Sequence, residues 1–209
     1  MTADEVEAMF TRASGEFSFA RWGRPIAPII FGVDDASMPV LKGAIEAVVK
    51  LAGHELTDTD PELGANLMVI FVREWRELSD TPKMCDLVPG LADLVGRLEA
   101  QGADQYRLFH YDPDGAIRAA FVFLRMTDEM ARQPAATLAL GQMVQVIVSW
   151  SDTAFKNRSP LARAPGSDLA VLKPEIATLV QAAYDPVLPQ SSDDAALALR
   201  LWARLERTG

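Results

Sequence analysis

The chain has very little of what most metal and disulfide centres are built from. Its 209 residues include one cysteine, Cys85, and two histidines, His54 and His110. A single cysteine excludes an intramolecular disulfide and a zinc site made of several cysteines. The two histidines lie far apart, which argues against a histidine-rich metal site but leaves a mixed site with carboxylates open. The glycine-rich patterns that cradle phosphates are also missing, and we predict no cofactor.

Basic residues are few, and they are scattered. Lys and Arg number 20 against 29 Asp and Glu, which gives a formal net charge of −9. No two basic residues are adjacent in the sequence. Proteins that bind nucleic acids cluster Lys and Arg against the phosphates. We therefore predict no nucleic-acid partner.

Long apolar runs are absent as well. The run at residues 138–150 is interrupted by Gln142 and Gln145, and it falls short of the roughly 18–20 residues that a membrane-spanning helix needs. The acidic start, MTADEVEAMF, lacks the basic-then-apolar order of a signal peptide. We predict no membrane span, and a cytoplasmic location for the chain as given; a trimmed leader would instead indicate the periplasm or secretion. The sequence leaves the oligomeric state open.

What the chain does contain is a succession of helix and strand patterns. Strand patterns at residues 25–31 and 67–72 enclose a helix pattern at 37–51, which predicts a parallel strand pair with a right-handed crossover. The turn Asp112-Pro113-Asp114-Gly115 predicts an antiparallel hairpin. We predict one α+β domain over residues 1–209, with a small mixed sheet and an antiparallel hairpin packed on several helices. Further predicted segments are helices at 3–13, 88–101, 127–132, 174–184 and 192–207, and a long loop at 151–167.

The most informative stretch is residues 134–150, PAATLALGQMVQVIVSW. It has no Asp, Glu, Lys, Arg, His or Cys, which predicts a helix buried on most sides. In zinc hydrolases of the H-E-x-x-H type, a central helix carries two metal ligands and the general base. Here the helix offers only the side chains of Thr137, Gln142, Gln145 and Ser149, so we interpret it as a core element first and a binding surface second.

Two places keep weak candidates for chemistry. His54 and Asp58 have the spacing of neighbours on one helical face and could bind a divalent metal, but Gly53 predicts that the helix has already ended, which favours a solvated histidine. His110, beside Asp112, is a candidate acid or base. A metal-dependent hydrolase with a dispersed site would need folding to bring His110, Asp152 and Glu175 together.

Several short segments carry a resemblance to a known family. They are Phe19-Ala20-Arg21-Trp22, Ala65-Asn66, the turn 112–115, Gln145 and Ala183-Tyr184-Asp185-Pro186. Together they resemble a bacterial family known only as domain of unknown function 2927, which is regarded as zincin-like. The resemblance covers most of the chain and implies a zincin-like fold.

The same resemblance implies that catalytic groups have been lost. In that family the central helix carries His-Glu-Glu or a similar acidic group ahead of the glutamine that matches Gln145. The corresponding residues here are Leu140, Gly141 and Gln142, and the family's Asn-Asp after the helix is Ser151-Asp152. Without the His and Glu there is neither a metal ligand nor a base to activate water. The resemblance therefore implies a catalytically inactive scaffold.

These observations favour a non-catalytic domain that binds a protein or peptide partner, because a sheet edge can add an extended peptide as a strand without catalytic residues. The candidate binding residues flank such a groove: Trp150, Phe155, Lys156 and Arg158. An alternative is that Trp150 and Phe155 only close the core. Another is a purely structural subunit, which predicts an exposed apolar patch on the helix at 3–13 or at 192–207.

Overall fold

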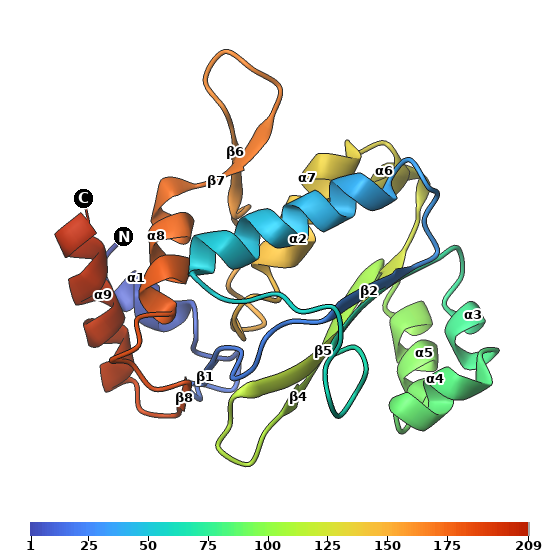
Figure 1. The fold of residues 1–209 in the computed structure, drawn as a ribbon, viewed down its shortest axis with the longest axis horizontal. Coiled ribbons are helices and arrows are strands. Elements are labelled where there is room, and N and C mark those ends of the chain that lie inside the picture. The colour runs from blue at the N-terminus through green and yellow to red at the C-terminus, as the bar shows by residue number, and fades with distance from the viewer. Residues whose placement is uncertain (209) are drawn as a thin grey trace.

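A mixed four-stranded sheet lies at the centre of the computed structural model, which describes residues 1–208 (Figure 1). Three adjacent strands run parallel to one another, and the fourth pairs antiparallel with the last of them in the predicted hairpin. The α+β class, the parallel pair and the hairpin are thus confirmed. In spatial order the strands are β2 (Pro28–Phe31), β3 (Leu67–Val72), β5 (Ile117–Arg125) and β4 (Gln105–Tyr111).

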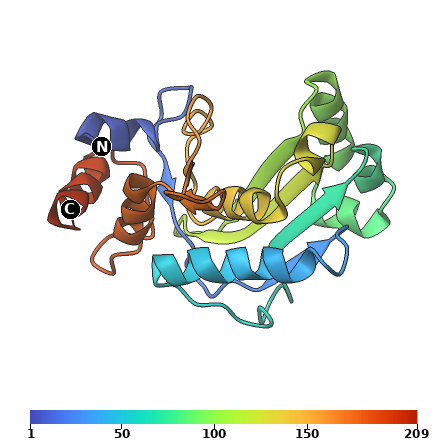
Figure 2. The ribbon, with the colours of Figure 1, turned by 90° about the horizontal axis from the view of Figure 1, so that it is seen from above.

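The first face of the sheet packs on the larger of two hydrophobic clusters. Helix α2 (Met38–Ala52) makes the crossover between β2 and β3, and it runs beside α7 (Ala135–Val144) (Figure 2). As predicted, α2 ends at Gly53, whose φ of 66° lies in the left-handed region that glycine adopts without strain. Alternate β3 side chains such as Val69 and Phe71 point into this cluster.

The second face packs on a smaller cluster under three helices. The side chains of Ile70 and Val72, which alternate with those of the first face, pack there beside the fully buried Trp75. Only the last of the three helices was predicted from the sequence. The helices are α3 (Arg76–Ser79), α4 (Pro82–Leu87) and α5 (Leu91–Ala100).

The chain ends lie together, where α1 (Ala3–Ala8) packs against α9 (Ala196–Thr208) (Figure 1). The predicted loop at 151–167 is only partly irregular, because β6 (Leu161–Arg163) pairs with β7 (Ala170–Leu172) in a hairpin that projects from the body. Across residues 1–208, no helix has both the length and the apolar character to cross a membrane. The remaining elements are β1 (Phe19–Ala20), α6 (Asp128–Ala131), α8 (Pro174–Ala183) and β8 (Ser191–Ser192).

The prediction of one helix over residues 134–150 is wrong at its C-terminal end. Helix α7 stops at Val144, and the following residues run back against the N-terminal part of the chain. Val148 forms a β-bridge with Arg21, and the Ser149 N–H donates to the Ala20 carbonyl at 2.8 Å. The β-branched run at 146–148 suits this extended backbone better than a helix. Residues 146–148 are buried, as predicted, but they lie in extended backbone that pairs with the N-terminal part of the chain and not in a helix.

Side chains satisfy the carbonyls around the end of α7. The last carbonyls of a helix lack partners within the helix and must find others. The Gln145 Nε2 donates to the Gly141 carbonyl at 2.9 Å, and the Trp150 Nε1 donates to the Val144 carbonyl at 2.7 Å. Two more buried donors bond the carbonyls just beyond the helix: Trp22 Nε1 to Val146 at 2.8 Å and Tyr184 Oη to Ile147 at 2.7 Å.

Candidate binding groove

The outer edge of β4 is unpaired. This strand is the last in the sheet, and within residues 1–208 no strand or isolated bridge pairs with its outer side. The Arg125 N–H donates to the Asp104 carbonyl at 2.8 Å, which makes these two residues a hydrogen-bonded pair. Such pairs alternate with non-bonded ones along an antiparallel ladder. The backbone N–H and C=O groups that point outward are therefore those of Gln105, Arg107 and Phe109.

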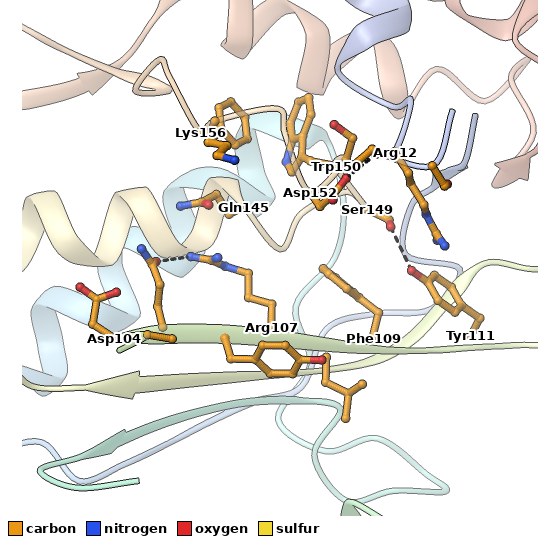
Figure 3. Close-up of a pocket in the computed structure, with 18 residues that line it drawn as sticks. Arg12, Asp104, Arg107, Phe109, Tyr111, Gln145, Ser149, Trp150, Asp152 and Lys156 are labelled. Atoms are coloured by element: carbon orange, nitrogen blue, oxygen red, sulfur yellow. Dashed lines mark hydrogen bonds between the residues drawn. The ribbon is translucent and has the colours of Figure 1, made fainter. Parts of the chain in front are cut away.

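A cavity of about 1210 Å³ follows this edge (Figure 3). One wall is β4, whose Arg107, Phe109 and Tyr111 side chains rise from the strand into the cavity. The other wall is the chain just after α7. A short segment after α1 closes one end. The lining ranges are 12–14, 103–109 with Tyr111, and Gln145 with 149–152, 155 and 156.

Hydrogen bonds tie the two walls together. The Arg107 Nη2 donates to the Oε1 atoms of Gln142 on α7 and of Gln105. The Gln142 Nε2 donates to Gln105 Oε1 at 3.1 Å. Further along, the hydroxyls of Tyr111 and Ser149 lie 2.9 Å apart. Hydrogen bonds within the chain thus fix the distance between the two walls before any ligand binds.

Arg107 is the unusual group in this groove. Burial lowers the pKa of its guanidinium to about 10, against an opposing effect of the Asp104 charge, so the group is still charged at neutral pH. Within residues 1–208 its hydrogen-bond partners are neutral amides, and no carboxylate lies within ion-pair distance. Its Nε is buried without a partner. Buried charges are ordinarily paired.

Three of the four predicted binding residues line the cavity. Trp150 stacks on Phe10, with centroids 5.3 Å apart and an interplanar angle of 11°, and Phe155 meets Trp150 edge-on at 5.1 Å. These two aromatic residues therefore pack on the core, as the core-closing alternative predicts, and they also face the groove, as the binding hypothesis predicts. Lys156 is exposed at the rim. Arg158 does not line the cavity in the described chain; it forms an ion pair with Glu175 at 3.5 Å.

The candidate catalytic residues are not brought together. Asp152 lines the groove, where its carboxylate accepts the Ala13 N–H at 2.9 Å. His110 lies against Phe121 of the second cluster, with ring centroids 5.5 Å apart, and Glu175 is paired with Arg158 as described. Among the described residues, no group of three or more His, Cys, Asp or Glu side chains could hold a metal ion.

The candidate metal pair, His54 and Asp58, lies beyond the end of α2 in different surroundings. His54 is half-buried, not solvated as predicted, and its Nε2 donates to the Arg24 carbonyl at 2.8 Å. Its ring lies 5.1 Å from that of Tyr184, and burial lowers the pKa of the imidazole. Asp58 is exposed in the loop beyond Gly53. The left-handed glycine ends the helix, so the predicted loss of helical spacing is confirmed.

Sequence patterns did not predict an ion network around Arg24. Arg24 contacts Glu62 at 3.0 Å, Asp112 at 3.1 Å and the buried Asp60 at 3.5 Å. Asp60 also accepts hydrogen bonds from the Glu62 and Leu63 N–H groups and from Asn66 Nδ2. This network, together with Arg118, links the turn 112–115 to the loop before β3.

Of the groove residues, Arg107, Phe109, Tyr111, Gln105 and Arg12 were not among those predicted. The signal that could have found the strand residues is the period of two along QYRLFHY, which places Gln105, Arg107, Phe109 and Tyr111 on one face of the strand. Of the three positions at which lost catalytic groups were expected from the sequence, Gln142 is buried and bonded to Arg107, and Leu140 and Gly141 are half-buried. The chain matches no family model, no curated protein and no solved structure.

Proposed function

We propose that this chain is a non-catalytic domain that binds an extended segment of a protein partner along β4. The observation that carries the proposal is the row of outward backbone groups on Gln105, Arg107 and Phe109 beside a cavity large enough for side chains. An added strand would satisfy those groups, and its alternate side chains would enter the cavity. The resemblance to a zincin-like family also supports binding without catalysis, because it implies that Leu140, Gly141 and Gln142 stand where that family has its catalytic groups.

The groove is suited to this role because its walls are already joined. The Arg107–Gln142 hydrogen bond fixes β4 against α7, and the Tyr111–Ser149 hydrogen bond fixes it against the chain after α7. A site that is ordered before binding loses less entropy when the ligand arrives. The aromatic wall of Trp150 and Phe155 supplies apolar surface, and such residues dominate binding energy at many interfaces.

The test is a selection from a random peptide library displayed on phage. Wild-type protein is compared with Phe109→Pro, which removes one outward N–H, a change that an edge strand tolerates. Phe109→Ala is the matched control, because it removes the same side chain and keeps the N–H. We expect peptides that enrich on wild type and on Phe109→Ala, more weakly on the latter, and not on Phe109→Pro. Thermal unfolding checks that all three proteins are folded.

Hydrogen exchange gives a second, independent readout. On binding of an enriched peptide, the amides of Arg107 and Phe109 should become protected, because they would then donate to the added strand. The amide of Leu108 points inward to β5 and should change little. Peptides that enrich equally on Phe109→Pro, or that leave the outward amides unprotected, would overturn the proposal.

A further inference from the structure

The groove is more basic than the chain as a whole. Three basic side chains line it, Arg12, Arg107 and Lys156, against the carboxylates of Asp104 and Asp152. In the whole sequence, acidic residues outnumber basic ones by 29 to 20. Asp152 is also partly engaged, because it accepts the Ala13 N–H. The local balance therefore favours an anionic ligand over a cationic one.

Arg107 is the basic group placed to make a specific contact. Arg12 and Lys156 are exposed at the rim, where charges are screened by solvent and salt. In Arg107, Nη2 makes both hydrogen bonds to glutamine oxygens, and Nη1 has no hydrogen-bond partner among residues 1–208. A guanidinium that neutral amides hold in place, with no carboxylate of the described residues within ion-pair distance, keeps a donor and a charge available for a carboxylate.

Building on the proposed function, we infer that the bound peptide carries an acidic side chain facing Arg107. The carboxylate belongs to a side chain, not to a peptide C-terminus, because the groove continues on both sides of Arg107. Residues 103–105 line it in one direction, and Phe109 and Tyr111 line it in the other. A chain that ended at Arg107 would leave half of the edge unpaired.

The same geometry specifies a second position in the peptide. Side chains two residues apart on a strand point to the same face, roughly 6.6–6.8 Å apart. Phe109 follows Arg107 on the groove face of β4, across the groove from Trp150 (Figure 3). Phe155, which meets Trp150 edge-on, also lines the groove. The ligand class is therefore an extended peptide with an acidic residue and an apolar residue separated by one position.

The phage selection tests this inference when the enriched peptides are sequenced. The displayed segments have no free C-terminus, so a carboxylate can come only from a side chain. We expect Asp or Glu two positions from an apolar residue on wild type, with loss of this preference on Arg107→Gln. Arg97→Gln is the matched control, because it removes the same charge from the exposed face of α5, across the sheet from the groove. Selection on Arg97→Gln should return the wild-type preference.

Calorimetry on one enriched peptide measures the contact without relying on a protein variant. Replacing its Glu by Gln should weaken binding to wild type about tenfold, as expected for loss of a charge-assisted hydrogen bond. The two peptides should bind Arg107→Gln with similar affinity. Equal binding of both peptides to wild type would overturn the acidic preference but leave the edge-binding proposal standing. Tighter binding by a version cut to end in a free carboxylate at that residue would overturn the side-chain assignment. A selection that yields no enriched peptide would overturn both.

Discussion

Arg24 and Arg107 are two half-buried arginines with opposite surroundings. Arg24 meets three carboxylates, those of Asp60, Glu62 and Asp112, at 3.5, 3.0 and 3.1 Å. Arg107 meets two neutral amide side chains and no carboxylate within ion-pair distance among residues 1–208. The first guanidinium stabilises the fold by joining two loops. The second guanidinium is held in place by amides but has no carboxylate partner among residues 1–208, as expected for a group that binds an anionic ligand.

The comparison shows why burial alone does not identify a functional residue. A covered charge with matched partners is balanced within the chain, whereas a covered charge with neutral partners costs stability that another molecule could recover. Arg107 also lines the largest cavity described along the free strand edge, while Arg24 lies beside loops that it holds together. The following experiments would break or sharpen this contrast.

The largest effect should come from the carboxylate at the centre of the Arg24 network. Asp60 is 2% exposed and accepts hydrogen bonds from two backbone N–H groups and from Asn66. Asp60→Ala should lower the free energy of unfolding by about 3 kcal/mol, because it leaves several covered donors without an acceptor. Urea denaturation measures this. Asp58→Ala, at an exposed position in the same loop, should change it by less than about 0.5 kcal/mol.

Replacing the two arginines by methionine compares them directly. Arg24→Met should destabilise the protein by about 2 kcal/mol, since it leaves Asp60 without its cation. Arg107→Met should leave stability unchanged or raise it by up to about 1 kcal/mol, because it removes a covered charge that lacks an anionic partner. Urea denaturation of both variants at one pH decides the point. Equal losses would show that Arg107 is a structural residue like Arg24.

A smaller effect is expected at the amide that holds Arg107. Gln142→Leu should cost about 1 kcal/mol, because it removes an acceptor from Arg107 and a donor from Gln105. In an Arg107→Met background the same change should cost less, since part of the interaction is already gone. A double-mutant cycle by urea denaturation measures the coupling. No coupling between the two positions would contradict the described contact.

The smallest effect should appear on mild acidification. Burial lowers the pKa of His54 below its ordinary value, so below about pH 6.5 the unfolded chain takes up a proton more readily than the folded one. Stability from this group is therefore complete above that pH and is lost as the pH falls toward the folded-state pKa. Denaturation midpoints between pH 7.5 and 5.5 should fall for wild type and fall less for His54→Gln. A steeper fall in the variant would contradict the assignment.

Asp60 should add a separate loss at lower pH. Burial raises the pKa of its carboxyl, but hydrogen bonds from Leu63, Glu62 and Asn66 and the Arg24 charge outweigh burial, and the net pKa is lowered. A carboxyl whose pKa is lower in the folded than in the unfolded chain stabilises the fold fully above its unfolded-state pKa. This stabilisation is lost as the pH falls through the folded-state pKa. The Asp60→Ala variant should therefore lose less stability than wild type over that acidic range.

Local patterns predicted the elements that local forces decide. β3 has the predicted bounds, α2 ends at the predicted glycine, and the turn 112–115 makes the predicted hairpin. Trp150, Phe155 and Lys156, which line the groove, were predicted as binding residues because aromatic and Arg side chains are the usual anchors at interfaces. Arg107 was missed because nothing near it in the sequence distinguishes a paired arginine from an unpaired one.

The sequence by itself determined the class of fold, the hairpin that contains β4 and the absence of ionisable side chains over residues 134–150. The tertiary structure alone decided where α7 ends and which charges lack partners. The donors that bond the carbonyls beyond α7 come from Trp22 and Tyr184, and the acceptor that orients Arg107 comes from Gln142. Helix and turn propensities act between residues a few positions apart. These contacts join residues 35 to 124 positions apart, and only the folded chain brings them together.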